Sequence, residues 1–141
     1  MSLAENLLLV AVFALVALAF GLLLWTGVSR RAAIMAKRVR IADIALDNAR
    51  WPEALRQRGN AYANQFELPV LFYVLVVFLF LTKQADLVAA VLGIVFAASR
   101  YLHAWIHVTT NHVPSRFQAF LVGVALLITM WVWFALRLVL A

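Results

Sequence analysis

The sequence predicts an all-α membrane protein, a bundle of four transmembrane helices in one domain over residues 1–141, with both termini on the non-cytoplasmic side. Two observations support this class. Of the 141 residues, 67% are hydrophobic and 13% are charged, whereas soluble domains are about a quarter charged. The chain also contains four apolar runs, each long enough to cross a hydrocarbon core of about 30 Å.

The first predicted span covers residues 6–28. A cleaved signal peptide is the alternative interpretation, but such a peptide begins with a positively charged segment. Here Glu5 precedes the apolar run, and Arg30 and Arg31 follow it. This order of charges favours an uncleaved helix with its N-terminus outside the cytoplasm.

Residues 29–59 form a polar stretch with a large excess of Lys and Arg, which is typical of a cytoplasmic loop. Its early part either continues the first helix or lies in the interface as an amphipathic helix. Pro52 suits the first turn of a new helix. Membrane orientation and anionic lipid account for the net charge of +6, so we expect no nucleic acid partner.

The remaining apolar runs predict spans over residues 60–82, 87–108 and 117–139. Pro69 lies inside the second span and removes one backbone hydrogen bond, so a modest kink is expected there. A tight polar turn separates the second and third spans. The short link before the fourth span contains Pro114 as a helix breaker.

Two stripes of polar side chains interrupt the second and third spans at helical spacing, so each stripe shares one helical face. The stripes are Asn60, Asn64 and Glu67 on the second span, and Arg100, His103 and His107 on the third. In an antiparallel hairpin, Glu67 would face Arg100, Asn64 would face His103, and Asn60 would face His107. The midpoint of each pair along the sequence falls inside the predicted turn. The stripes should therefore lie at matching depths.

Glu67 and Arg100 are the deepest pair, roughly 10 Å further into the membrane than Asn60 and His107 by helical rise. An unpaired charge at that depth costs a few kcal/mol. We therefore expect Glu67 and Arg100 to compensate each other, either directly or through a shared ligand or water. The alternative is structural, because polar residues in membrane bundles also hold helices together.

Arg116 stands beside these stripes, just before the fourth span, where a helix N-terminus adds partial positive charge. Such a position can stabilise an anion, including a thiolate. The chain has no cysteine, so a thiol would have to come with a ligand. A zwitterionic or anionic ligand suits the site, with Arg side chains binding its carboxylates and Glu67 its ammonium group.

These motifs resemble the MAPEG family, the membrane-associated proteins of eicosanoid and glutathione metabolism. The segment from Asn64 to Glu67 matches the family's Asn-x-x-Glu motif, which contacts glutathione. The sequence is similar to a bacterial-type branch of the family. Members of the family also use basic residues just beyond the first helix, and Arg38 or Arg40 corresponds to these residues.

The third span resembles members similar to microsomal prostaglandin E synthase. Arg100, His103, His107 and Arg116 keep the spacing of an Arg, His, Tyr and Arg in those proteins. The resemblance gives Arg116 the role of holding the glutathione thiolate.

The chain also departs from the family pattern. Many members have an Arg at the position of Asn60, for which Arg58 is the nearest equivalent, and His107 and Phe120 occupy frequent Tyr positions. The helix-two Pro of several members stands one place later than Pro69. These departures weaken the case for eicosanoid reactions and leave the thiol-stabilising Arg intact.

The resemblance implies a homotrimer in a lipid bilayer, expected to be the bacterial inner membrane, with glutathione bound between subunits near the cytoplasmic face. The implied activity is that of a glutathione transferase or peroxidase acting on a lipophilic electrophile or hydroperoxide. Two alternatives remain. One is a non-enzymatic scaffold or lipid-binding protein, and the other is a metal or haem site at His103 and His107.

Overall fold

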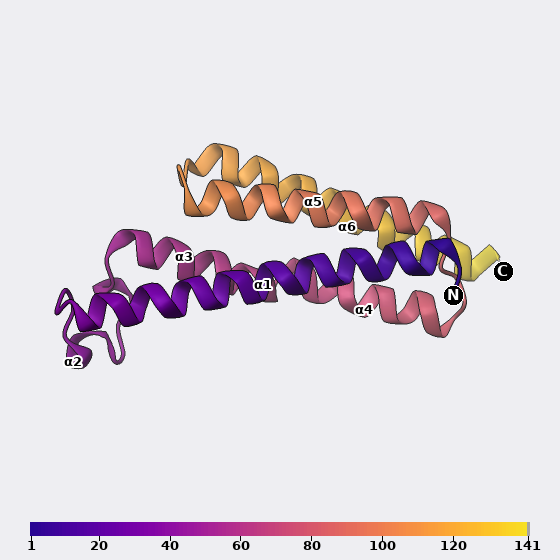
Figure 1. The fold of residues 1–141 in the computed structure, drawn as a ribbon. Coiled ribbons are helices and arrows are strands. Elements are labelled where there is room, and N and C mark those ends of the chain that lie inside the picture. Colours follow the sequence, from indigo (N-terminus) through magenta and orange to yellow (C-terminus); the bar gives the residue numbers. More distant parts are fainter. Residues whose placement is uncertain (141) are drawn as a thin grey trace.

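The computed structural model describes residues 1–140, and it is helical with no strand among these residues. Four helical segments are long and apolar enough to cross a membrane: Leu3–Met35, Glu53–Leu81, Leu87–Val108 and Val113–Leu140. They run side by side in one elongated bundle, and the two ends of the chain lie at the same end of it (Figure 1). The predicted four-helix membrane fold is confirmed, and the chain is an integral multi-pass membrane protein.

Helix α1 (Leu3–Met35) has a defined cap at each end. At its start the Ser2 hydroxyl accepts a hydrogen bond from the Glu5 N–H, and the Glu5 carboxylate accepts one from the Ser2 N–H, a reciprocal capping box. At its end Lys37 adopts a φ of 56°, and its N–H donates to the Ile34 carbonyl at 2.9 Å. A residue in the left-handed region closes the helix in this way.

Residues 29–59, predicted as one loop, are partly helical. α1 continues to Met35, and α3 (Glu53–Ala63) begins well before the predicted start of the second span. Between them lie only the short helix α2 (Ile41–Ile44) and the 3-10 turn η1 (Asn48–Arg50). Of the two alternatives for this region, continuation of the first helix is the one observed.

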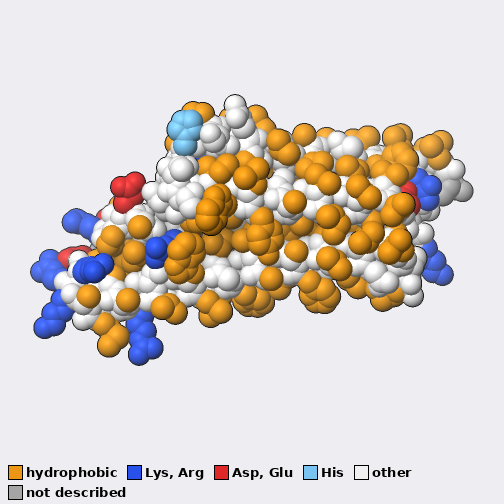
Figure 2. All heavy atoms as spheres, turned by 45° about the horizontal axis from the view of Figure 1, so that its top comes forward, with side chains coloured by type: hydrophobic (Ala, Val, Ile, Leu, Met, Phe, Trp, Pro, Cys, Tyr) orange, Lys and Arg blue, Asp and Glu red, His pale blue; other side chains and the backbone are white. Residues whose placement is uncertain are grey.

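Charge is distributed unevenly along the bundle. Lys and Arg side chains gather at the end that carries α2, and hydrophobic side chains cover much of the length between the charged ends (Figure 2). Much of this apolar surface lies on the outward faces of the helices, with side chains such as Phe13, Phe20 and Val77 more than half exposed. Such surface suits contact with lipid.

The second span is broken where a continuous helix with a modest kink at Pro69 was predicted. α3 ends at Ala63, the 3-10 turn η2 (Asn64–Phe66) follows, and α4 (Leu68–Leu81) begins after Glu67. Pro69 lacks an N–H, and its ring would clash with the carbonyl of Gln65 in a continuous helix. The chain therefore stops one helix before the Pro and starts another, with Pro69 in its first turn.

α5 (Leu87–Val108) has the predicted bounds, and α1 and α6 (Val113–Leu140) pack against it. α6 begins earlier than the predicted residue 117, so Pro114 lies in its first turn rather than in the link. Close approach of the helices is seen at Gly93, where a Cβ would lie 3.2 Å from Leu8 Cδ2 and 3.3 Å from Phe72 Cε2.

Asp86 joins α5 to α6 at the end of the bundle that carries both termini. Its Oδ1 accepts from the Ala89 N–H at 2.8 Å, and its Oδ2 accepts from the Trp133 indole at 2.9 Å. Arg137 Nε lies 3.7 Å from the same carboxylate. Asp86 is therefore at once a helix cap and a link between two helices.

We expect Asp86→Ala to lower the free energy of unfolding by about 2 kcal/mol, because a cap and a hydrogen bond are each worth about 1 kcal/mol. Thermal unfolding in detergent measures this loss. Asp43→Ala is the matched control, because the Arg40–Asp43 pair is exposed to solvent and such pairs contribute little. Equal unfolding temperatures for the two variants would contradict the role of Asp86.

Candidate functional site

A groove of about 270 Å³ opens between η2, α5 and α6. We call it the histidine groove. Its lining residues are Asn64, Glu67, His103, His107, Val113, Arg116, Phe117 and Phe120. Both predicted stripes and the predicted thiolate-binding Arg contribute to it.

Arg100 lies beneath the groove and is completely buried in this chain. Its Nη2 donates to the backbone carbonyl of Asn64 at 3.4 Å, while its Nε and Nη1 have no partner among residues 1–140. The broken helix supplies this carbonyl, because a 3-10 turn leaves carbonyl groups outside the regular α-helical pattern. A buried guanidinium with two unpaired donors is costly and suited to binding an anion.

Glu67 and Arg100 form no direct ion pair, so their compensation through a shared ligand or water stays a prediction. No ion pair within 4.0 Å joins these two side chains, and Glu67 is exposed while Arg100 is buried. The prediction assumed two continuous helices. The 3-10 turn at Asn64–Phe66 changes the direction in which the following side chains point around the helix axis. Matching depth therefore does not bring the two groups into contact.

Two buried histidines line the groove from α5. His103 Nδ1 lies 3.2 Å from the backbone carbonyl of Arg116, and because a carbonyl only accepts, Nδ1 must carry the hydrogen. In the neutral ring His103 Nε2 is then an acceptor, and it has no partner within the described chain. The rings of His103 and His107 meet edge to face, with centroids 5.8 Å apart, and His107 Nδ1 is likewise unpartnered.

Arg116 lies in the first turn of α6 and is half-buried. Its Nη1 donates to the side-chain Oδ1 of Asn111 at 2.5 Å. Asn111 was not among the predicted site residues. The feature that could have identified it is its position just beyond the end of α5, where Asn tolerates the left-handed backbone that ends helices.

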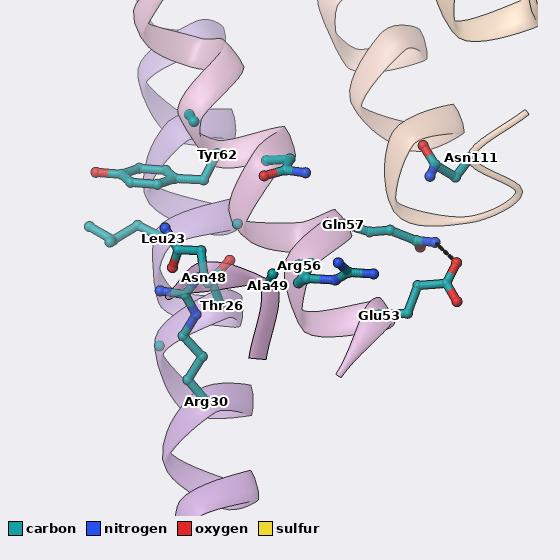
Figure 3. Close-up of a pocket in the computed structure, with 14 residues that line it drawn as sticks. Leu23, Thr26, Arg30, Asn48, Ala49, Glu53, Arg56, Gln57, Tyr62 and Asn111 are labelled. Carbon is teal, nitrogen blue, oxygen red and sulfur yellow. Dashed lines mark hydrogen bonds between the residues drawn. The ribbon is translucent and has the colours of Figure 1, made fainter. Parts of the chain in front are cut away.

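A larger hollow of about 690 Å³ lies between α1 and α3 (Figure 3). Its lining includes Asn60 and Asn111. The buried Thr26 hydroxyl and Arg30 Nε in its wall have no partner among residues 1–140. A Cβ at Gly59 would lie 2.8 Å from Arg30 Nη2, so a larger residue there would require the end of the Arg30 side chain to shift. Arg30 was not predicted as a site residue.

The structure separates Arg58 and Arg38 from the histidine groove. Arg58 Nη1 donates to the Ser29 hydroxyl at 2.5 Å, and its guanidinium lies 4.3 Å from the centroid of the Trp25 ring. Arg58 and Arg38 together line a different hollow of about 490 Å³. Arg58 lies about 240° around the helix from Asn64 at 100° per residue, so the two face different directions.

The metal alternative gains no further ligands from the structure. Across residues 1–140, no three or more His, Asp or Glu side chains lie close enough together to hold a metal ion. His103 and His107 have Arg100 and Arg116 as neighbours, and these charges would repel a cation.

Comparison with known proteins identifies one relationship. The sequence model of the MAPEG family matches residues 8–136, which is most of the chain and includes every residue of the histidine groove. Searches of curated proteins and of solved structures found no significant match.

Proposed function

This chain belongs to the MAPEG family, and on that premise we propose that it is a membrane glutathione transferase or peroxidase acting on lipophilic substrates. The observation that carries the proposal is the gathering of two guanidinium groups, two unpaired imidazole nitrogens and one carboxylate around the histidine groove. Glutathione carries two carboxylates, an ammonium group and a thiol, so it complements this set of charges.

One carboxylate, the ammonium group and the thiol of glutathione would each have a counterpart at the groove. The free donors of Arg100 would bind a carboxylate, and Glu67 would bind the ammonium group. Asn64 and the histidines supply hydrogen bonds to the peptide groups. Arg116 would hold the sulfur, where its positive charge favours the thiolate over the thiol and so lowers the thiol pKa.

The hollows beside the histidine groove offer further polar groups for the rest of the ligand. Arg38, Arg58 and Asn60 line the hollows beside α1 and α3. We propose a homotrimer, as the family resemblance implies. In this assembly the α1–α3 side of one copy and the groove of the next would enclose a single ligand.

The chemistry is nucleophilic attack by the thiolate. With an aryl chloride, the sulfur forms a bond to carbon and chloride leaves, after the thiol proton has passed to water. With a lipid hydroperoxide, the sulfur takes the distal oxygen as the O–O bond breaks and an alcohol leaves; a second glutathione then yields the disulfide and water. The bilayer concentrates both kinds of apolar substrate beside the groove.

We further propose that the groove faces the cytoplasm of a bacterial cell from the inner membrane. Support comes from the Lys- and Arg-rich end that carries α2 (Figure 2), because such charges remain on the cytoplasmic side. The histidine groove lies toward that same end, beside the link from α5 to α6.

Isothermal titration calorimetry with glutathione tests this function, together with conjugation of chlorodinitrobenzene by the purified protein. We expect saturable binding at millimolar glutathione or below and thiol-dependent turnover. Ophthalmic acid, which replaces the thiol with a methyl group, is the control and should bind without turnover. Absence of binding at millimolar glutathione from an intact, assembled protein would contradict the proposal and favour a scaffold or lipid-binding role.

A further inference from the structure

The link between α5 and α6 holds Asn111 in a defined position. Asn111 has a φ of 47°, in the left-handed region that Asn and Gly tolerate better than other residues. Its backbone N–H donates to the Ile106 carbonyl at 2.8 Å, which ties it to the last turn of α5. The origin of the Asn111 side chain is therefore fixed by the end of a helix.

The Asn111 side chain is hydrogen-bonded to Arg116. Asn111 Oδ1 accepts from Arg116 Nη1 at 2.5 Å, and the Arg116 backbone carbonyl meets His103 Nδ1 at 3.2 Å. The backbone of Arg116 is thus bonded to α5, and its guanidinium is bonded to the link that follows α5. Asn111 also lines the hollow beside α3, whereas Arg116 lines the histidine groove, so the hydrogen bond lies between the two spaces.

We propose that Asn111 is a positioning residue that holds one edge of the Arg116 guanidinium and thereby directs its remaining donors toward the bound thiolate. This inference rests on the proposed glutathione function. A neutral amide suits the task, because it orients the guanidinium without cancelling its charge. A carboxylate at this position would pair with Arg116 and compete with the thiolate for it.

Other charged and titratable groups also lie around Arg116. Glu67 faces the groove from the start of α4, and His103 and His107 face it from α5, with Arg100 buried beneath. His112 is engaged on the exposed side of the link with the Ser115 hydroxyl, at 2.8 Å. Glu67 is the one carboxylate in the lining of the groove.

Two substitutions separate geometry from charge. Asn111→Gly removes the side chain and keeps the backbone, because Gly adopts a positive φ freely. Asn111→Asp keeps the shape and adds a negative charge. Lys83→Gly is the matched control, because Lys83 has a φ of 55° in the link at the opposite end of α5, far from the groove.

We expect Asn111→Gly to lower kcat for chlorodinitrobenzene conjugation about tenfold while the Kd for glutathione by calorimetry changes less than threefold, since positioning affects the reacting sulfur most. Asn111→Asp should move the rising limb of the pH–rate profile upward by about one pH unit, because a carboxylate beside Arg116 offsets its charge. Ultraviolet absorbance of the bound thiolate should show the same displacement. Lys83→Gly should leave kcat and the profile unchanged.

Wild-type rates and an unchanged pH profile in both Asn111 variants, with an active wild-type protein, would overturn this inference and leave the proposed function intact. A wild-type protein that neither binds nor conjugates glutathione would overturn both. If Asn111→Gly fails to assemble, the pH displacement in Asn111→Asp decides the matter alone.

Discussion

Replacing Arg116 with Ala is expected to lower kcat/KM for glutathione conjugation by about 100- to 1,000-fold, the range measured when one preorganised donor to a developing anion is removed. Arg116 lies in the first turn of α6 and lines the histidine groove, so its charge adds to that of the helix N-terminus. Without it, the bound thiol loses the group that favours its ionised form. Steady-state rates over a range of pH measure the loss.

Arg137→Ala provides the control for this variant. Arg137 belongs to the same helix but lies at its other end, where it contacts Asp86 and Gln84. It should retain wild-type turnover. Turnover by Arg116→Ala within threefold of wild type, with assembly intact, would show that the thiolate is stabilised elsewhere.

Replacing Arg100 with Met is expected to leave the ligand-free protein at least as stable as wild type while abolishing its stabilisation by glutathione. Arg100 is fully buried with two unpaired donors, so removal of its charge relieves a desolvation cost. Met is shorter than Arg, but its flexible apolar side chain fills much of the space. At glutathione concentrations of 100 times the Kd, wild type should gain about 2.7 kcal/mol, which the variant should lack.

Thermal unfolding with and without glutathione measures both effects. Arg31→Met, at an exposed position of α1, should behave as wild type in the two conditions. If Arg100→Met unfolds in the absence of ligand, Arg100 is a structural element of the bundle. If it is stabilised by glutathione as much as wild type, the anion lies away from Arg100.

The fold was predictable where the signals are local. α5 has the predicted bounds because Asp86 is a strong cap at its start and two Thr residues follow its end. The turn at Lys83 follows from the polar break between two apolar runs. Helix ends in the basic region were less predictable, since apolar length marks the membrane span but not how far α1 continues beyond it.

The candidate site was predictable in composition but not in detail. Asn64, Glu67, His103, His107 and Arg116 share one groove, as the two stripes suggested. A direct Glu67–Arg100 contact was predicted as one of two alternatives and is not observed, because the prediction continued helical periodicity across the break before Pro69. That break could have been anticipated, since a Pro disturbs the carbonyl four residues earlier as well as its own position.

Side-chain partners across elements were beyond sequence reasoning. Arg58 contacts Trp25 and Ser29 on α1. A helical pattern within one span does not reveal such partners on another helix. The bond from Arg116 to Asn111 depends on a left-handed residue in a short link. Such contacts follow from the geometry of a turn, which composition alone does not define.

The structure of the protein determined with bound glutathione tests the central claim most directly. We expect density for glutathione in the histidine groove, with its sulfur within hydrogen-bond distance of the Arg116 guanidinium and a carboxylate at Arg100. Density for glutathione at another place in the protein, or an empty groove at saturating glutathione, would contradict the account.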